Sequence, residues 1–279
     1  MAPATWREQA AAEPQLTEAD FTAIARLVRE TAGIVLGNGK RELVYSRLRR
    51  RLRALNLDSF LAYRALLEGP DGLEERERMV NAITTNLTSF FRESHHFQHL
   101  AEIVLPHLSQ RERRLRVWSA GCSTGEEAYS MALTVERSLP ARESWDARIL
   151  ATDIDTDVLA SAAAGQYPAS RLEGIPTQYA SLLPPAAPDG MVTLPPAIRR
   201  LVTFKHLNLL EAWPMRGPFD AIFCRNVVIY FDKQTQRSLF DRFANLLRPG
   251  GYLYVGHSES LYRCCDRFTH AGRTIYRKL

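Results

Sequence analysis

The sequence predicts an α/β protein, in which an all-helical domain precedes a doubly wound parallel sheet. Short apolar runs rich in β-branched or aromatic residues predict strands at 115–120, 148–153, 202–209, 219–224 and 251–256. Helical patterns at about 125–138, 155–164 and 233–248 separate several of these runs. The chain before residue 100 shows helical patterns only.

The helical domain is expected over residues 17–90. Residues 1–16 are rich in Ala, Pro and Glu, and we expect them to be flexible. Thr17, followed by Glu18 and Asp20, has the pattern of a helix N-cap, and Gly33 would end that helix. Further helices are predicted at about 40–55, 58–68, 73–83 and 93–108.

The sheet domain is expected over residues 91–279, with one interruption. Residues 167–200 are rich in Pro and Ala and predict a small β insertion. Near the end of the domain, Gly250-Gly251 is expected to allow a sharp turn from a helix into the last strand.

The composition is that of a folded globular protein, with 46% hydrophobic and 24% charged residues. No apolar stretch is long enough to cross a bilayer, and the start of the chain lacks a basic segment followed by an apolar one. We therefore expect a cytoplasmic protein without direct membrane insertion. The four cysteines form no CxxC pair, which disfavours a disulfide framework or a zinc site.

A turn of small residues follows the first predicted strand. Residues 120–127 read AGCSTGEE, and such a turn lets backbone N–H groups approach a ligand. The same letters contain G-x-S-x-G, so Ser123 is an alternative hydrolytic nucleophile. The context disfavours that alternative, because a hydrolase builds several strands before its nucleophile and needs an acid and a histidine in chain order afterwards.

An acidic residue ends the second predicted strand. Asp153 is placed to accept hydrogen bonds from the hydroxyls of a nucleoside ribose. The alternative role is a helix N-cap, which Asp155 or Thr156 would fill equally well. The turn and Asp153 together predict a nucleoside-binding sheet.

Several longer blocks resemble the chemotaxis receptor methyltransferase (CheR) family. They are TTNLTSFFRE (84–93) with HHF (95–97), VWSAGCSTGEEAYS (117–130), ATDIDTDVL (151–159), HLNLL (206–210), FCRNVVIYF (223–231) and GHSE (256–259). The resemblance spans residues 17–279. It implies a Rossmann-like class I methyltransferase sheet and the transfer of methyl groups from S-adenosylmethionine to chemoreceptor glutamates, with S-adenosylhomocysteine as the product.

The resemblance also implies the residues of the cofactor site. Asn86, Thr88 and Arg92 would reach the amino-acid end of the cofactor. Glu127, rather than its neighbour Glu126, would bind the amino group, and Asp153 the ribose. The adenine and methionine sides would be lined by Asn208, Leu209, Arg225 and Asn226.

Two residues are expected to be catalytic by the same resemblance: Tyr230, facing the reacting methyl group, and Arg92. A glutamate carboxylate, with an ordinary pKa of about 4.3, is ionised at neutral pH, so no general base is needed. Two alternative functions are a cofactor-binding module that no longer transfers methyl groups and a nucleic-acid methyltransferase. The intact site residues disfavour the first, and the lack of an NPPY-like or catalytic-cysteine motif disfavours the second.

The second predicted helix is strongly basic. The apolar residues Val44, Leu48, Leu52 and Leu55 form one stripe, and the predicted receptor-binding arginines lie beside it: Arg47, Arg50, Arg51 and Arg53. Glutamate-rich surfaces of a chemoreceptor helical bundle would complement this face. A solvated basic face is the plain alternative. Nucleic acid is disfavoured because no aromatic residue interleaves with the arginines. We expect a monomer.

Two further expectations concern metals and receptor tethering. His95 and His99 are spaced i,i+4, yet no third ligand is nearby, so we expect helix packing and no metal. Some members of the family grip a C-terminal receptor peptide with a three-stranded insertion that carries a glycine-rich loop. Here residues 183–190 read LPPAAPDG, and prolines lack the N–H that strand addition uses. We predict independence from that peptide, although an edge strand near 191–194 would still allow pairing.

Overall fold

The structure is a computed structural model that describes residues 13–108, 113–139 and 141–279. The chain divides into two compact units: the first comprises the residues up to Thr31 and Leu36–Ile83, the second Ala32–Val35 and Thr84–Leu279. Most of the segment predicted to be flexible, 1–16, lies outside the described residues.

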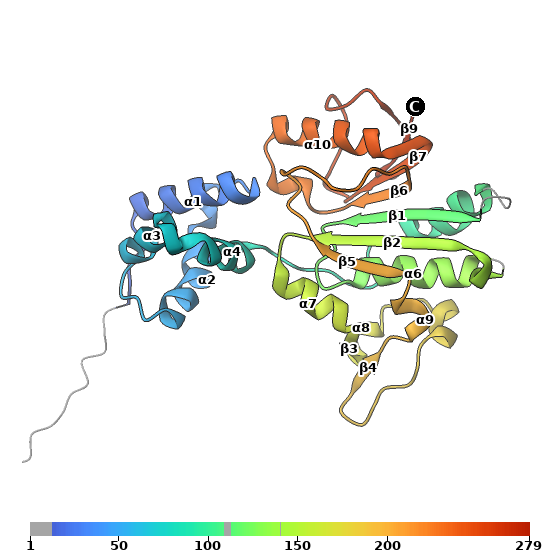
Figure 1. Cartoon of the computed structure of the whole chain (residues 1–279), viewed down its shortest axis with the longest axis horizontal. Helices are drawn as coiled ribbons and strands as arrows, with labels where there is room; N and C mark the ends of the chain where they lie inside the picture. The colour runs from blue at the N-terminus through green and yellow to red at the C-terminus, as the bar shows by residue number, and fades with distance from the viewer. Residues whose placement is uncertain (1–12, 109–112, 140) are drawn as a thin grey trace, which may run out of the picture. The chain divides into compact units, whose positions relative to one another are not determined.

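The first unit is built from four α-helices, as the sequence predicts: α1 (Glu18–Ala32), α2 (Arg41–Ala54), α3 (Phe60–Glu68) and α4 (Leu73–Ile83) (Figure 1). The predicted cap of α1 is confirmed. The Asp20 backbone N–H donates to Thr17 Oγ1 at 3.2 Å, while Asp20 Oδ2 accepts from the Thr17 backbone N–H at 3.3 Å. Two otherwise unpaired donors are thereby satisfied where the helix begins.

The core of the first unit includes the apolar stripe of α2, since Val44, Leu48 and Leu52 are all buried. Two of the arginines beside this stripe are held within the unit. Arg51 forms an ion pair with Glu75 at 2.6 Å, and Arg47 Nη1 donates to the Ile83 carbonyl at 2.5 Å. The basic face of α2 is therefore smaller than the sequence suggests.

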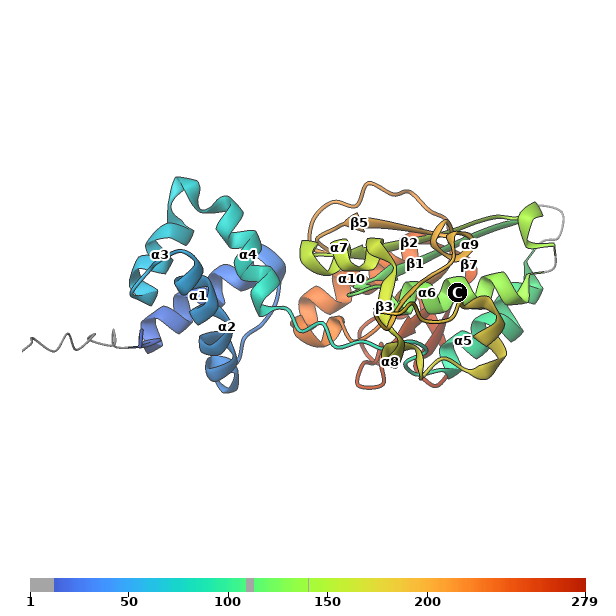
Figure 2. The same ribbon diagram turned by 90° about the horizontal axis from the view of Figure 1, so that it is seen from below.

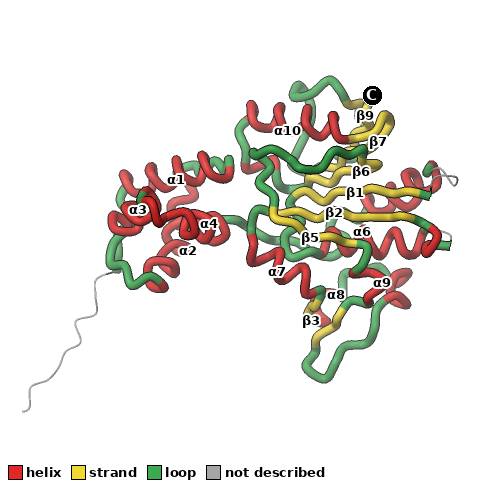
Figure 3. The backbone as a smooth tube through the Cα atoms, viewed as in Figure 1, coloured by secondary structure: helices red, strands yellow, loops and turns green. Residues whose placement is uncertain are grey.

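The second unit contains a mixed seven-stranded sheet of order β5-β2-β1-β6-β7-β9-β8 (Figure 3). Five strands are parallel to one another: β1 (Arg114–Ala120), β2 (Asp146–Asp153), β5 (Val202–His206), β6 (Phe219–Cys224) and β7 (Leu247–Val255). The hairpin of β8 (Phe268–Gly272) and β9 (Ile275–Lys278) adds two antiparallel strands. The predicted doubly wound sheet is confirmed, and the final hairpin, which pairs with β7, adds an antiparallel edge for which no strands were predicted from the sequence.

Alternate residues of the strands face two separate apolar layers. Leu115 and Val117 of β1 pack with α5 (His95–His99), the following π-turn and α6 (Glu126–Ser138). Trp118 and Ala120 pack with α10 (Lys233–Leu246) on the other face. Figure 2 shows α5 and α6 together on one side of β1 and β2. Helices thus cover both faces, as a doubly wound sheet requires.

A small insertion follows α7 (Thr156–Ala164). It contains β3 (Gln166–Pro168), α8 (Ala169–Leu172), β4 (Met191–Thr193) and α9 (Pro196–Arg199). β3 and β4 pair antiparallel, and Tyr167 lies opposite Val192. In Figure 1 the insertion lies beneath the large sheet.

The glycine pair at 250–251 lies inside β7. α10 ends at Leu246 and β7 begins at Leu247, while Gly250 has a φ of +72°. Where β7 pairs with β6, Phe219 lies opposite Leu247 but Ala221 lies opposite Tyr252. The extra residues of β7 form an irregularity in which Gly250 takes the left-handed conformation that favours glycine. The predicted glycine turn is therefore displaced into the strand. Across the described ranges, no helix has the length and apolar character needed to cross a bilayer.

Candidate active site

The carboxyl ends of three neighbouring strands carry the predicted site residues of the sheet. β1 pairs with β2 on one side and with β6 on the other, all parallel. The turn 121–125 follows β1, Asp153 ends β2, and the segment Arg225–Tyr230 follows β6. In an open parallel sheet, ligands bind outside the carboxyl ends of the strands.

The turn after β1 is held in an unusual backbone conformation. Gly121, Ser123 and Gly125 have φ values of +92°, +50° and +95°. A Cβ at Gly121 would lie 2.3 Å from a methyl group of Val227, so the turn and the segment after β6 approach each other closely. The Ser123 hydroxyl donates to the Asn86 carbonyl at 3.0 Å, and no histidine bonds to it in the described part of the chain. This arrangement speaks against a hydrolytic nucleophile.

Asp153 is buried at the end of β2 and is bound to the turn. Its Oδ2 accepts from the Ser123 backbone N–H at 2.8 Å, and its Oδ1 from the Asp155 backbone N–H at 3.0 Å. Burial raises the pKa of its carboxyl group above the ordinary value. The helix-cap role falls to Asp155, which caps α7 through the N–H groups of Asp157 and Val158. Asp153 is thus available as an acceptor toward a ligand.

The segment that enters the second unit after Ile83 also reaches this region. Asn86 Nδ2 donates to Asp155 Oδ2 at 2.7 Å, so this side chain orients the second aspartate. Thr88 is half-buried, and its hydroxyl makes no hydrogen bond to any other residue that the structure describes. Arg92 is also half-buried, and its Nη1 donates to the Leu87 carbonyl at 2.9 Å.

Glu127 and Arg225 form a buried ion pair. Arg225 Nη1 lies 3.0 Å from Glu127 Oε2, and Glu127 Oε1 accepts from the Ser119 hydroxyl at 2.7 Å. The Arg225 side chain is only 2% exposed, and its Nη2 also bonds to the Arg92 carbonyl and lies 3.6 Å from Glu93. Burial raises the pKa of Glu127 although Arg225 opposes the shift. The Arg225 guanidinium is therefore shielded from solvent, and it holds the Glu127 carboxylate in place.

A buried carboxylate organises the segment after β6. Glu259 accepts hydrogen bonds from the backbone N–H groups of Asn226 at 2.8 Å, Ile229 at 3.2 Å and Gly256 at 2.5 Å. These bonds hold Asn226 at a φ of +59°. Tyr230 lies in the short turn that follows, half-buried, and its hydroxyl makes no hydrogen bond to any described residue. This hydroxyl is free to meet a substrate.

Asn208 and Leu209 follow β5. Asn208 is buried, and its Oδ1 accepts from the Leu210 backbone N–H at 3.0 Å. Leu209 belongs to the apolar layer that contains α10, and its carbonyl accepts from Arg242 Nη1 at 2.6 Å. Both residues are thus fixed at the β5 edge of the sheet.

The histidines of α5 pack against β7 and the turn between β8 and β9. His95 Nε2 contacts the Arg273 carbonyl at 3.1 Å, His96 Nε2 the Thr274 hydroxyl at 2.9 Å, and His99 Nδ1 the Tyr254 hydroxyl at 2.8 Å. The predicted packing role is confirmed.

Glu93, His95 and His96 offer ligand atoms within 4.8 Å of one another, the spacing of a metal site. The positive charge of Arg225 lies 3.6 Å from Glu93, however, and it disfavours a cation there.

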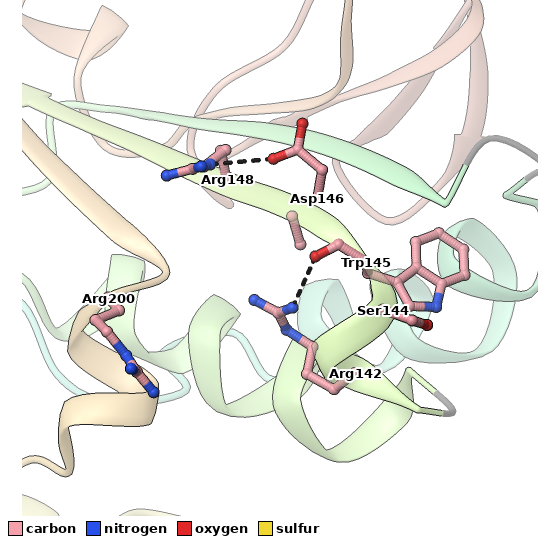
Figure 4. A pocket seen from close by; sticks show the side chains of 7 residues that line it. Arg142, Ser144, Trp145, Asp146, Arg148 and Arg200 are labelled. Carbon is pink, nitrogen blue, oxygen red and sulfur yellow. Dashed lines mark hydrogen bonds and ion pairs between the residues drawn. The ribbon is translucent and has the colours of Figure 1, made fainter.

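A hollow of about 450 Å³ lies elsewhere, at the start of β2 (Figure 4). Arg142, Arg148 and Arg200 line it together with Asp146, which accepts from Arg148. β2 begins at Asp146 and ends at Asp153, so this hollow is at the opposite end of the strand from the predicted site. It contains none of the predicted site residues.

The donor set at the carboxyl ends fits S-adenosylmethionine. Asp153 offers carboxylate oxygens to a ribose, Glu127 offers a buried negative charge to an ammonium group, and a left-handed turn lies between them. Fold and site together define a methyltransferase that uses this cofactor.

Two family models match the chain: the all-alpha domain of CheR methyltransferases over residues 19–84 and the S-adenosylmethionine-binding domain of CheR methyltransferases over residues 86–277. The chain belongs to the CheR methyltransferase family.

Several known chemotaxis methyltransferases are similar in sequence to this protein over most of its length. A probable chemotaxis protein methyltransferase of Rhizobium etli is 45% identical over 90% of this chain and 96% of its own. The chemotaxis protein methyltransferase of Salmonella typhimurium is 45% identical over 94% of this chain and 90% of its own. That of Escherichia coli is 44% identical over 94% and 91%.

Several residues of the site were not assigned a role from the sequence. Glu93 and Glu259 stand in blocks that carry the family resemblance, TTNLTSFFRE and GHSE, so a signal for them was present. Ser119 likewise stands in such a block, VWSAGCSTGEEAYS, whereas Tyr167 and Arg171 carry no comparable signal, because their contacts depend on how separate elements pack.

Proposed function

We propose that this protein transfers the methyl group of S-adenosylmethionine to glutamate side chains in the cytoplasmic helical bundle of a chemoreceptor, forming methyl esters, and that it acts in the cytoplasm as a monomer. The observation that carries the proposal is the Tyr230 hydroxyl, which bonds to no described residue. It lies in the segment after β6 that also holds Arg225 and Asn226, at the same end of the parallel strands as Asp153. Relatives named chemotaxis protein methyltransferases, about as long as this chain, support it.

The proposed cofactor site assigns each side chain a chemical task. Asp153 accepts from the ribose hydroxyls, and Glu127 accepts from the amino group. Glu126 has a different task, because its carboxylate bonds to Thr124 and to Arg171 of the insertion. Asn86 acts through Asp155, and Arg225 through Glu127. The remaining members of the site are Thr88, Asn208, Leu209 and Asn226.

In the proposed reaction the protein mainly has to align the receptor carboxylate with the methyl group, because neither group needs chemical activation by the protein. The bound cofactor supplies the electrophile as a sulfonium methyl group. The receptor carboxylate is ionised at neutral pH, and one of its oxygens bonds to the methyl carbon as the carbon–sulfur bond breaks, which leaves a neutral ester and a neutral thioether. Tyr230 and Arg92 hold this carboxylate in line. Removing it from water is the main cost, which the neutralisation of both charges partly offsets.

Labelled methyl transfer tests the proposal directly. Purified protein, S-adenosylmethionine with a labelled methyl group, and a chemoreceptor cytoplasmic fragment should give label on the fragment, released by base as expected for an ester. A fragment with its methylation-site glutamates replaced by alanine is the control. Label that persists on the control fragment, or binding of the cofactor without any transfer, would contradict the proposal.

For receptor recognition we propose the exposed part of the basic face, Arg50 and Arg53 of α2. Both side chains are exposed, and within the described part of the chain Arg53 has one distant ion pair, 3.9 Å from Glu13. Arg47 and Arg51 were predicted to belong to the same surface. Their bonds to the Ile83 carbonyl and to Glu75 make them part of the helical unit instead, so the proposal no longer relies on them.

We further propose that recognition does not require a peptide at the C-terminus of the receptor. The loop before β4 contains Pro184, Pro185 and Pro188, and its backbone is already bonded internally, from Ala187 N–H to the Met191 carbonyl at 2.8 Å. Few N–H groups therefore remain for strand addition.

Calorimetric titration with the C-terminal pentapeptide of the receptor tests this point. We expect no heat, while full-length receptor and a receptor lacking the pentapeptide are methylated at equal rates. Micromolar binding, about −8 kcal/mol, would contradict it.

A further inference from the structure

The two adjacent glutamates at the start of α6 point to different partners. Glu127 bonds to Ser119 and Arg225. Glu126, whose relative exposure is 0%, accepts from the Thr124 hydroxyl at 2.6 Å and from Arg171 Nη1 at 2.7 Å. Arg171 belongs to α8 of the insertion. Glu126 therefore joins the turn after β1 to the insertion.

A second side chain of the insertion contacts the same turn. The Tyr167 hydroxyl of β3 donates to the Thr124 carbonyl at 2.6 Å. A Cβ at Gly125 would lie 2.9 Å from this hydroxyl oxygen, so the tyrosine lies directly against the turn. The ring of Tyr167 is itself held by an edge contact with Phe90, at a centroid distance of 5.0 Å. The contact is therefore fixed on both sides.

Physical reasons make these two contacts important for the shape of the turn. A left-handed backbone at Ser123 persists only where the surroundings enforce it. A fully buried carboxylate such as Glu126 requires a partner, because an uncompensated buried charge is strongly unfavourable. Arg171 is half-exposed, so water screens part of the attraction, yet its guanidinium is the one cation within bonding distance of Glu126 among the described residues.

We infer that Tyr167 and Arg171 are positioning residues of the S-adenosylmethionine site. They hold Thr124, Gly125 and Glu126, and through them fix the turn and the first residues of α6, including Glu127. The inference rests on the proposed placement of the cofactor against this turn. Two residues of the insertion would then support the turn that binds the cofactor. This role is independent of any role of the insertion in receptor binding.

Binding of S-adenosylhomocysteine by calorimetry, with each variant well below its melting temperature, tests the inference. Arg171→Met and Tyr167→Phe should each weaken binding between about threefold and thirtyfold. Arg171→Lys should restore most of the affinity, because it keeps the charge beside Glu126. In steady-state assays KM for the cofactor should rise while KM for the receptor fragment stays constant, a split that general loss of structure would not produce.

Matched variants separate the possible failures. Arg148→Met, at the other end of β2, should bind as the unsubstituted protein does. If Arg171 acts through Glu126, Arg171→Met combined with Glu126→Gln should lose no more affinity than Arg171→Met alone. Normal affinity in folded Arg171→Met and Tyr167→Phe, while Asp153→Ala binds weakly, would overturn this inference alone. Normal affinity in Asp153→Ala would overturn the placement of the cofactor. Should Arg171→Met fail to fold, Tyr167→Phe, which removes only a hydroxyl, decides the question.

Discussion

Glu259 Oε2 accepts a hydrogen bond from the backbone nitrogen of Asn226 at 2.8 Å, and the same carboxylate binds the N–H groups of Ile229 and Gly256. A single buried side chain thus ties the residues after β7 to the segment that carries Tyr230. Burial raises the pKa of this carboxyl group, while the backbone donors oppose the shift.

Glu259→Gln should therefore lower catalysis indirectly, because Glu259 positions the segment that carries Tyr230 and is not proposed to contact the substrate. The amide places donors where backbone N–H groups already point, which should cost about 1–3 kcal/mol of unfolding free energy. A misplaced Tyr230 should lower kcat between about tenfold and a hundredfold. Chemical denaturation and methyl-transfer kinetics measure the two effects. Exposed Glu102→Gln is the control, and an unchanged kcat in Glu259→Gln would remove the residue from this role.

Asp153→Ala should weaken binding of S-adenosylmethionine by about 1.5–3 kcal/mol, since hydrogen bonds to a charged acceptor are lost. Calorimetry on the folded variant gives the difference directly. Asp157→Ala, an exposed aspartate of α7, should bind normally. Equal affinity of the two variants would mean that the ribose lies elsewhere.

Tyr230→Phe should keep the cofactor affinity and lower the transfer rate on the order of a hundredfold, because only a hydroxyl near the reacting methyl group is lost. Single-turnover transfer to a receptor fragment measures the rate. Tyr262→Phe, with a side chain that is exposed, serves for comparison. A rate equal to that of the comparison variant would leave Tyr230 as a packing residue.

Reversing the charge of Arg50 and Arg53 to Glu should abolish methylation of the receptor and leave cofactor binding intact. Attraction between exposed charges is screened by salt, so receptor binding by the unsubstituted protein should also weaken as ionic strength rises. A protein with Arg216 and Arg237 reversed, both exposed in the second unit, controls for net charge. Normal methylation by the Arg50/Arg53 variant would show that these two arginines form a solvated surface without a role in receptor binding.

His96 should make the protein sensitive to acid. Burial, aided by Arg225, lowers the pKa of His96 from 6.5 to about 2. The unfolded chain takes up a proton below pH 6.5 and the folded chain does not, so stability is lost as pH falls from 6.5 toward 2. Between pH 6.5 and 5 this histidine should remove about 2 kcal/mol of unfolding free energy. In His96→Gln the unfolding free energy should no longer fall in this way between pH 6.5 and 5. In His206→Gln, which replaces an exposed histidine, the fall should remain.

The sequence predicts the parallel strands and the longer helices because most of them have an apolar face that the protein buries. It misses β8 and β9 because both strands are short and mix polar with apolar residues. In the edge strand β8 only Phe268 is buried. It cannot separate Glu126 from Glu127, since both begin α6 and only the surrounding packing decides which one meets the insertion. The inward direction of Arg51 likewise depends on Glu75, which is 24 residues away along the chain.

The hairpin of β8 and β9 has a consequence for synthesis. Arg273 and Thr274 at its turn bond to His95 and His96, which follow the segment that contains Arg92. β9 also pairs with β7, the strand that leads into the segment with Glu259. When the turn after β1 and the segment after β6 have been synthesised, the hairpin that makes these contacts has not yet been translated. We expect nascent chains that stop before about residue 275 to lack methyltransferase activity, so that the cell gains activity only from chains translated through the hairpin.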